Sequence, residues 1–398
     1  MKTLFGLPST VKYCSRCIVS NQRPSSTVEF ENNNKQKETI QFDDDGVCVA
    51  CRWHDIKYNE IDWDSREEEL LRLVDRFRSK TGDFDVVVPG SGGKDSLFVS
   101  NELKQRYGMT PLTVTWPPHI YTEIGWKNFQ SWLDMGIANI SLTPNKEFHR
   151  RLTAAAFKNL CHPFQPFILG QKRIGVATAL DYGIPLVMYG ESQAEGGTDI
   201  REAMSPKMPT KYFSKADSQA RDVLLGGVHY DEWLSEGASP ADLRFYQPNS
   251  LNDIQRQGVE VHHFGYYKLW RPQDRYYYAV ENSNFQPNPV RTEGTYSKYS
   301  SLDDKLDGFH YYTTFVKFGI GRATYDAAQE IRNGHITRDE GVSLVRTYDG
   351  EFPEKYFQEF LDYCSITEDQ FWSIINTNRS PHLWIKERDQ WRLRYQVK

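Results

Sequence analysis

The stretch Val86-Val87-Val88-Pro89-Gly90-Ser91-Gly92-Gly93-Lys94-Asp95-Ser96 joins a short apolar strand to a helix through a glycine-rich turn. Glycines allow backbone N–H groups to approach an anion closely, and the positive end of the following helix points at the same place. Ser91, Ser96 and Lys94 add two hydroxyl groups and a positive charge. We therefore predict that residues 91–96 bind phosphate.

Asp95 distinguishes this loop from a Walker A motif, in which Gly-Lys is followed directly by Ser or Thr. A carboxylate beside a phosphate is explained mainly by a bound Mg²⁺ ion. The sequence thus predicts that Asp95 is a magnesium ligand. The alternative is an ordinary glycine turn at the end of a buried strand, and the match of six residues in a strand–loop–helix context disfavours it.

Strand and helix signals alternate on both sides of the loop. Apolar and β-branched runs predict strands, and segments with helical spacing of apolar residues predict helices between them. This order predicts an α/β fold with a doubly wound parallel sheet. The predicted strands cover residues 84–88, 112–116, 137–142 and 185–189, and the predicted helices cover 65–80, 95–107, 122–135, 145–160 and 170–182.

The alternation ends after Gly190, and we divide the chain into four parts on that basis. We expect a zinc-ribbon-like module in residues 1–60 and the phosphate-binding α/β domain in 61–204. Residues 205–260 are polar and are expected to form a helical insertion or lid. Residues 261–398 are rich in aromatic residues and then helical, and we expect them to bind the substrate.

Four of the six cysteines form two pairs, Cys14/Cys17 and Cys48/Cys51. Two such pairs supply the four thiolates of a structural Zn²⁺ site. The separation between the pairs is longer than in most zinc ribbons, and a hairpin over residues 26–42 would account for it. A redox dithiol is the alternative, and the presence of two pairs favours zinc. We expect the metal to stabilise a module with little core of its own.

Composition narrows the class of protein. The chain has 398 residues and a net charge of -5 at pH 7, so it lacks the bulk positive charge of a nucleic-acid-binding protein. It contains no apolar run long enough to span a bilayer, and residues 1–12 do not resemble a signal peptide. We expect a cytoplasmic protein with no nucleic-acid partner and no membrane insertion.

Residues 91–96 resemble the Ser-Gly-Gly-x-Asp-Ser signature of the PP-loop ATP pyrophosphatases, and the likeness extends over about residues 84–195. Members attach AMP to a substrate oxygen and release pyrophosphate. The resemblance implies that Lys94, Asp95 and Glu191 are catalytic. It implies that the nucleotide-binding residues are Ser91, Gly92, Gly93, Lys94, Asp95, Ser96, Val114, Thr115, Trp116 and Gly190.

Residues 291–310 and 317–324, together with the cysteine pairs, are similar to the bacterial N-acetyl sugar amidotransferases. These enzymes act in surface-glycan biosynthesis, including lipopolysaccharide O-antigen and nonulosonic acids. The resemblance implies an ATP-dependent conversion of a sugar's acetamido group into an acetamidino group. It also implies ATP, Mg²⁺ and structural Zn²⁺ as cofactors.

Basic side chains in this region are candidates for binding an acidic or nucleotide-linked sugar, because guanidinium groups suit carboxylates and phosphates. The candidates are Lys317, Arg322, Arg332 and Arg338. Helix-surface charge is the alternative, and it stays open for Arg332 and Arg338. Asp303, Asp304 and Asp307 either include a second metal ligand or cap a turn and a helix.

The source of ammonia is not visible in the sequence. Residue 2 is Lys, so an N-terminal cysteine nucleophile is absent, and neither Cys161 nor Cys364 has a glutaminase context. We therefore expect a separate glutaminase as a partner, similar to the glutaminase–cyclase pair of histidine biosynthesis. Two other functions remain open: a PP-loop tRNA sulfur transferase that uses Cys161, and a zinc-bearing nucleotide sensor, against which Asp95 argues.

Overall fold

The computed structural model describes residues 2–24, 38–191, 193–197 and 199–398. The hairpin predicted over residues 26–42 therefore lies largely outside the described residues. The central sheet is formed by β1 (Val86–Pro89), β2 (Pro111–Thr115), β3 (Ala138–Ser141), β4 (Leu186–Tyr189) and β7 (Glu260–His263). All five strands are parallel, in the order β3-β2-β1-β4-β7.

Successive residues of the inner strands pack into different hydrophobic cores. Val86 and Val88 lie in one core, and Val87 lies in the other. Because neighbouring side chains of a strand point to opposite faces, both faces of the sheet are covered. This confirms the predicted doubly wound α/β fold.

The first four strands begin and end within two residues of the predicted bounds. β7 was not predicted, because its two histidines and its glutamate hide the apolar strand signal. His262 and His263 are nevertheless buried, since β7 pairs along the whole of β4.

The order of the strands reverses at β1, which has β2 on one side and β4 on the other. In open α/β sheets, ligands bind outside the carboxyl ends of the strands at such a switch point. The chain leaves β1 into the glycine-rich loop and leaves β4 at Gly190 and Glu191. The fold therefore brings these two predicted segments to the same edge of the sheet.

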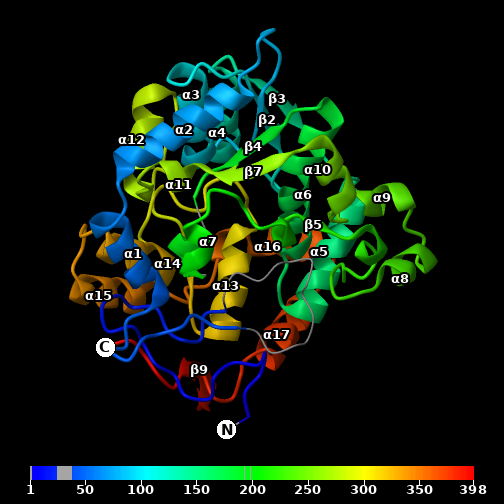
Figure 1. Cartoon of the computed structure of the whole chain (residues 1–398). Coiled ribbons are helices and arrows are strands. Elements are labelled where there is room, and N and C mark those ends of the chain that lie inside the picture. Colours follow the sequence, from blue (N-terminus) through cyan, green and yellow to red (C-terminus); the bar gives the residue numbers. More distant parts are fainter. Residues whose placement is uncertain (1, 25–37, 192, 198) are drawn as a thin grey trace.

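Helices cover the two faces of the sheet (Figure 1). One core contains residues of α2 (Trp63–Phe77), α3 (Lys94–Gln105) and α11 (Phe264–Tyr267), and α12 (Pro272–Asn282) packs on α3. The other core contains α5 (Lys146–Leu160) and α6 (Gln165–Tyr182). α4 (Glu123–Leu133) begins as predicted, because the Thr122 side chain accepts a hydrogen bond from the Gly125 N–H.

The region predicted as a helical insertion contains short helices: α8 (Tyr230–Ser235), α9 (Pro240–Arg244) and α10 (Leu251–Gln257). Its aromatic residues Tyr212, Trp233 and Tyr246 are buried in the same core as α5 and α6. Two-residue strands, β5 (Ser214–Lys215) and β6 (Asn249–Ser250), pair with each other.

The C-terminal region is helical, as predicted, and ends in a β-hairpin that was not predicted. The hairpin consists of β8 (Trp384–Glu387) and β9 (Gln390–Leu393). In Figure 1 this region lies below the sheet, together with α1 (Val49–Asn59) of the cysteine module. Its helices are α13 (Asp307–Phe318), α14 (Arg322–Arg332), α15 (Arg338–Tyr348), α16 (Phe357–Cys364) and α17 (Glu368–Thr377).

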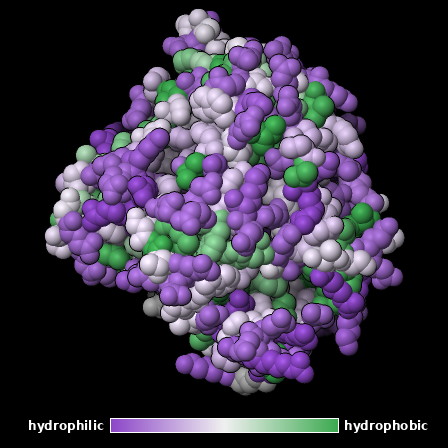
Figure 2. Space-filling model, turned by 180° about the vertical axis from the view of Figure 1, so that it is seen from behind, coloured by the Kyte–Doolittle hydropathy of each residue, from purple (hydrophilic) through white to green (hydrophobic). Residues whose placement is uncertain are grey.

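The cysteine module packs on α14 and α15, although more than 250 residues separate them in the sequence. Cys14, Cys17, Cys48 and Cys51 share one hydrophobic core with Ala327, Ala328 and Val342. The opposite view in Figure 2 shows a mostly hydrophilic face with scattered hydrophobic residues. Within the described ranges, no helix is both long and apolar enough to cross a bilayer.

Candidate active site

The glycine-rich loop packs tightly against α4. Gly92 has φ +83°, and a Cβ atom there would lie 2.8 Å from the Cα of Phe129. Only glycine fits both the left-handed backbone and the close approach. α3 begins at Lys94 with Gly93 as its N-cap, so the positive helix end faces the predicted phosphate site.

Lys94 and Asp95 form an ion pair at the start of α3, with 2.5 Å between Lys94 Nζ and Asp95 Oδ2. The other oxygen, Asp95 Oδ1, is buried and has no hydrogen-bond partner among the described residues. An unpartnered carboxylate oxygen beside a phosphate-binding loop fits a hard divalent cation. The predicted roles of Lys94 and Asp95 are therefore compatible with the geometry.

The loop opens into a cavity of about 720 Å³. Lys94 and Asp95 contribute from α3, Glu191 contributes from the end of β4, and the wall opposite is α14. A smaller hollow of about 190 Å³ is lined by residues 91–95 of the loop, by Asp303 and by Arg322. Arg322 lines both spaces, so the loop and α14 belong to one site.

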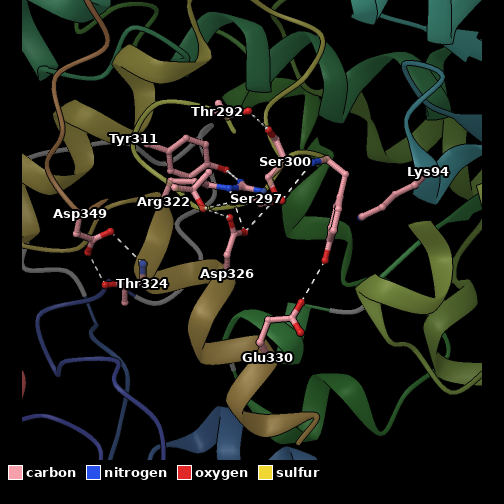
Figure 3. Close-up of polar contacts among 12 residues, drawn as sticks. Lys94, Thr292, Ser297, Ser300, Tyr311, Arg322, Thr324, Asp326, Glu330 and Asp349 are labelled. Carbon is pink, nitrogen blue, oxygen red and sulfur yellow. Dashed lines mark hydrogen bonds and ion pairs between the residues drawn. The ribbon is translucent and has the colours of Figure 1, made fainter. Parts of the chain in front are cut away.

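The α14 wall carries Arg322, Asp326 and Glu330 at four-residue intervals, which places them on one side of the helix. Figure 3 shows these side chains across from Lys94. Arg322 Nε lies 3.2 Å from Asp326 Oδ1, and Arg322 also donates to the Tyr311 hydroxyl. The Tyr299 hydroxyl donates to Glu330 Oε1 at 3.1 Å. The wall is thus a polar surface whose side chains are held in place by hydrogen bonds and ion pairs among themselves.

The Asp349 carboxylate fixes the start of α14. It accepts hydrogen bonds from the backbone N–H groups of Gly321 and Thr324, each at 3.0 Å, and from the Thr324 hydroxyl at 2.5 Å. These groups would otherwise be unsatisfied at the helix N-terminus. Asp349 therefore orients the helix turn that carries Arg322.

Glu191 is a cavity carboxylate whose pKa is strongly shifted. The side chain of Glu191 opens onto the cavity, but the surrounding protein removes water from its carboxyl group. This desolvation raises the pKa of Glu191 to about 7. The negative charge of Asp95 adds to the rise. A carboxyl group with such a pKa can accept and donate a proton near neutral pH.

The four predicted sugar-binding cations do not all reach the cavity. Arg322 and Arg332 line it. Lys317 does not, because its Nζ donates to the carbonyl of Leu160 at 2.9 Å, at the C-terminus of α5. Arg338 Nε donates to the carbonyl of Cys17 at 3.1 Å. Lys317 and Arg338 therefore do not line this cavity, and a role for them in substrate binding stays a prediction.

The residues predicted to lie near adenine are buried. Val114, Thr115 and Trp116 are each at most 3% exposed. The Trp116 ring packs so closely on α6 that a Cβ at Gly170 would lie 2.2 Å from it. None of the three lines the two spaces beside the loop, so adenine contact here stays a prediction.

Two of the three aspartates at 303, 304 and 307, Asp303 and Asp304, have different roles. Asp303 lines the hollow beside the loop, and burial raises the pKa of its carboxyl. Asp304 is structural: its Oδ2 lies 2.7 Å from His119 Nδ1, and its Oδ1 accepts from the Leu306 N–H at 2.9 Å. Sequence reasoning missed Arg23, Tyr299 and Tyr325 as cavity residues, because they are dispersed along the chain.

The four paired cysteines form the predicted cluster, with all Sγ atoms within 4.8 Å of one another. The Cys14–Cys51 and Cys17–Cys48 Sγ distances are 3.8 and 3.7 Å. Four sulfurs about 2.3 Å from a central zinc ion would be about 3.8 Å apart. The backbone N–H of Cys48 donates to Cys14 Sγ at 3.3 Å, as suits a thiolate. The donor set and its spacing fit Zn²⁺.

The cysteine module also contacts the chain segment that follows β4. Lys57 Nζ lies 2.9 Å from Glu195 Oε1, and the Trp53 indole donates to the same oxygen at 3.0 Å. Lys57 is 2% and Glu195 8% exposed, so the pair is buried. The cysteine module therefore contacts the cavity wall directly, because Glu195 also lines the cavity.

Comparison with known proteins gives one informative match. Residues 293–398 match the family described as LPS biosynthesis protein WbpG-like, C-terminal domain. The comparison with curated proteins gave no match. A solved structure, NMN synthetase from Francisella tularensis, is 12% identical to this chain, and the alignment covers 78% of this chain and 97% of that structure. The TM-score is 0.30, which is too low to show a shared fold. Over residues 293–398, which include the α14 wall, the chain is similar to the C-terminal domain of WbpG-like lipopolysaccharide biosynthesis proteins.

Proposed function

We propose that this protein is an ATP-dependent amidotransferase that converts the acetamido group of an N-acetyl sugar into an acetamidino group for surface-polysaccharide biosynthesis. One observation carries the proposal. Residues of the glycine-rich loop, Lys94 and Asp95, line one cavity with the α14 wall, which lies in the part of the chain similar to WbpG-like lipopolysaccharide biosynthesis proteins. A phosphate-binding group and a glycan-related domain therefore face the same space.

In this proposal the loop holds the phosphates of ATP. The backbone N–H groups of Gly92 and Gly93, the Ser91 hydroxyl and the Lys94 ammonium group are the donors, whereas the Ser96 hydroxyl donates to the Gly93 carbonyl at 3.2 Å. Asp95 holds Mg²⁺, which would neutralise phosphate charge. Gly90 and Gly190 are explained by packing, because a Cβ at Gly90 would lie 2.1 Å from Ser96 Cβ and one at Gly190 would lie 3.0 Å from the Trp270 ring.

The chemistry explains why ATP is needed. An amide oxygen is a very poor leaving group. When it attacks the α-phosphorus of ATP, pyrophosphate leaves and the oxygen becomes part of an AMP ester. Ammonia then adds to the amide carbon, and AMP leaves with the oxygen. Glu191 accepts the proton that the incoming nitrogen loses, because its carboxyl titrates near neutral pH.

The buried cysteines favour this reaction over tRNA sulfur transfer. Cys161 and Cys364 are 1% and 4% exposed, and burial raises the pKa of each thiol to about 12. A thiol in that state is a poor nucleophile, and neither residue lines the cavity. The same observation supports a separate glutaminase as the ammonia source.

A direct assay tests the proposal. The purified protein is incubated with ATP, MgCl₂, ammonium chloride and a panel of nucleotide-linked and acidic N-acetyl sugars. We expect AMP and pyrophosphate in equal amounts and a sugar whose mass shows one oxygen replaced by NH. Release of ADP, or AMP formation without a modified sugar across the panel, would refute it. A nucleotide sensor would bind ATP without either product.

A further inference from the structure

Arg23 belongs to the cysteine module but lines the cavity opposite the phosphate loop. Its backbone is held on both sides, because its N–H donates to the Ser20 carbonyl at 3.3 Å and its carbonyl accepts from the Ile40 N–H at 2.8 Å. The position of the side chain is therefore set by the fold of the module.

The guanidinium of Arg23 lies over the ring of Tyr325 on α14, with 4.6 Å between its Cζ and the ring centroid. It also passes close to the chain after β4, because a Cβ at Gly196 would lie 3.0 Å from Arg23 Nη2. A guanidinium stacked on an aromatic face keeps its edge N–H groups available for a planar anion. Three separate parts of the chain therefore position this one group.

Charge balance distinguishes Arg23 from the other cavity arginines. Arg322 pairs with Asp326, and Arg332 Nη2 donates to the Glu195 carbonyl at 3.3 Å. Within the part of the chain that the structure describes, Arg23 has no carboxylate or carbonyl partner for its guanidinium. A preorganised cation without a counter-ion at a cavity wall is suited to an anionic ligand.

Arg23 does not line the hollow beside the phosphate loop, although it shares the large cavity with Lys94 and Asp95. Arg322 lines both the large cavity and the hollow beside the loop, whereas Arg23 lines the large cavity alone. A ligand group at Arg23 therefore lies beyond the space that the loop encloses.

We infer that Arg23 binds an anionic group of the second substrate, a phosphate or a carboxylate, and that the cysteine module thereby forms part of the substrate site. The identity of that substrate as a sugar rests on the proposed function, whereas the anion site rests on the contacts of Arg23. The module then has a role in recognition as well as in stability.

The test measures binding in the absence of ammonia, so that no turnover is needed. Calorimetry compares wild type and Arg23→Gln for UDP-N-acetylglucosamine, for N-acetylneuraminate and for neutral N-acetylglucosamine. We expect the variant to bind at least one charged sugar about 10- to 100-fold more weakly, the range of a lost charge-assisted hydrogen bond. Binding of ATP and of the neutral sugar should not change. The charged sugar that is affected shows whether a phosphate or a carboxylate is bound.

Matched variants separate recognition from folding. Arg52→Gln removes the same charge from the same module, but Arg52 does not line the cavity, so it should bind like wild type. Tyr325→Phe keeps the aromatic face and should change the affinity for the charged sugar only slightly. Tyr325→Leu removes that face and should weaken binding of the charged sugar. Thermal melting confirms that each variant is folded.

Three outcomes would overturn the inference: equal binding of charged sugars by wild type and Arg23→Gln, no binding of either charged sugar by wild type, or an equal loss of ATP binding in the variant. A clear binding effect without formation of an acetamidino product would refute the proposed reaction and leave the anion site standing.

Discussion

Asp95 has two carboxylate oxygens in different surroundings, one held by Lys94 and one buried without a partner. Asp95→Asn keeps the shape of the side chain and removes its charge. We expect turnover to fall about 100-fold or more, the size of effect seen when a preorganised electrostatic group is lost at a reacting centre. The melting temperature should not fall. Steady-state AMP release measures the effect.

The control for this variant is Asp231→Asn, an equal charge change at an exposed side chain on α8. It should leave turnover unaltered. Turnover of the Asp95 variant at the wild-type rate would show that the loop does not hold a catalytic cation through this residue.

The raised pKa of Glu191 predicts how the stability of the protein depends on pH. Its pKa in the folded protein is raised from 4.5 to about 7, so the folded state holds the proton more tightly than the unfolded state does. The contribution of Glu191 to the free energy of unfolding is fully present below pH 4.5 and is lost as the pH rises through 7. Glu191→Gln cannot ionise. The melting temperature of Glu191→Gln, relative to that of wild type, should therefore increase between pH 5 and pH 8.

Activity should show the opposite trend, because a base must be deprotonated. At a fixed concentration of free NH₃, wild-type turnover should rise through pH 7, and Glu191→Gln should be slow without that rise. A pH profile shared by the two proteins would exclude Glu191 as the base.

At the scale of elements, the prediction from sequence succeeded where periodicity is strong. Four strands, the loop and the helices between them have clear patterns, so they were placed within a few residues. β7 was missed because its side chains are mostly polar, although pairing with β4 buries them. The β8–β9 hairpin was missed because the tail was predicted to be helical to its end.

The site was predictable only in part, for a related reason. The loop is a continuous motif, and residues 91–95 line one hollow together with Arg322 at the start of α14. The α14 wall depends on helix rotation, which decides that Arg322 faces the cavity and Lys317 faces α5. Arg23 reaches the site from another module, and no pattern in the sequence indicates such a tertiary contact.

The contact between Asp349 and the start of α14 gives an element-scale prediction. Asp349→Ala removes the acceptor for two backbone N–H groups and for the Thr324 hydroxyl. Loss of a helix cap costs about 1 kcal/mol, and up to about 2 in folded proteins. Urea denaturation should show that decrease, and the KM for the sugar should rise because Arg322 is less well positioned.

Asp349→Asn is the informative control, because its amide oxygen can still accept a hydrogen bond. It should be intermediate in stability. If Asp349→Ala were as stable as wild type, the cap would not be what holds the α14 wall.

At the scale of the whole molecule, the cysteine cluster should hold about one Zn²⁺ per chain. Because the module contacts the chain segment that follows β4 through Lys57 and Glu195, Cys14→Ser should lower the melting temperature and weaken substrate binding together. Elemental analysis and thermal melting measure the two effects. Cys161→Ala serves as a cysteine control outside the cluster. Absence of zinc, or iron in its place, would contradict the assignment.

The source of nitrogen is a second property of the whole molecule. Both lone cysteines are buried, so the chain has no exposed thiol for glutamine hydrolysis. We expect turnover with ammonium salts, no turnover with glutamine alone, and recovery of glutamine use when a partner glutaminase is added. Coupled detection of glutamate and AMP distinguishes these cases. Efficient use of glutamine by the pure chain would show that the nitrogen source was misread.

The packing of the cysteine cluster on α14 and α15 has a consequence for biosynthesis. Arg338 Nε contacts the Cys17 carbonyl across 321 residues of sequence. At roughly 5–20 residues per second, a ribosome needs on the order of 15–60 s to make that stretch. Throughout this interval the first thiols lack the helices that later cover them. Metal captured during translation would protect them from oxidation, so the zinc supply during synthesis, rather than afterwards, should set the yield of intact protein.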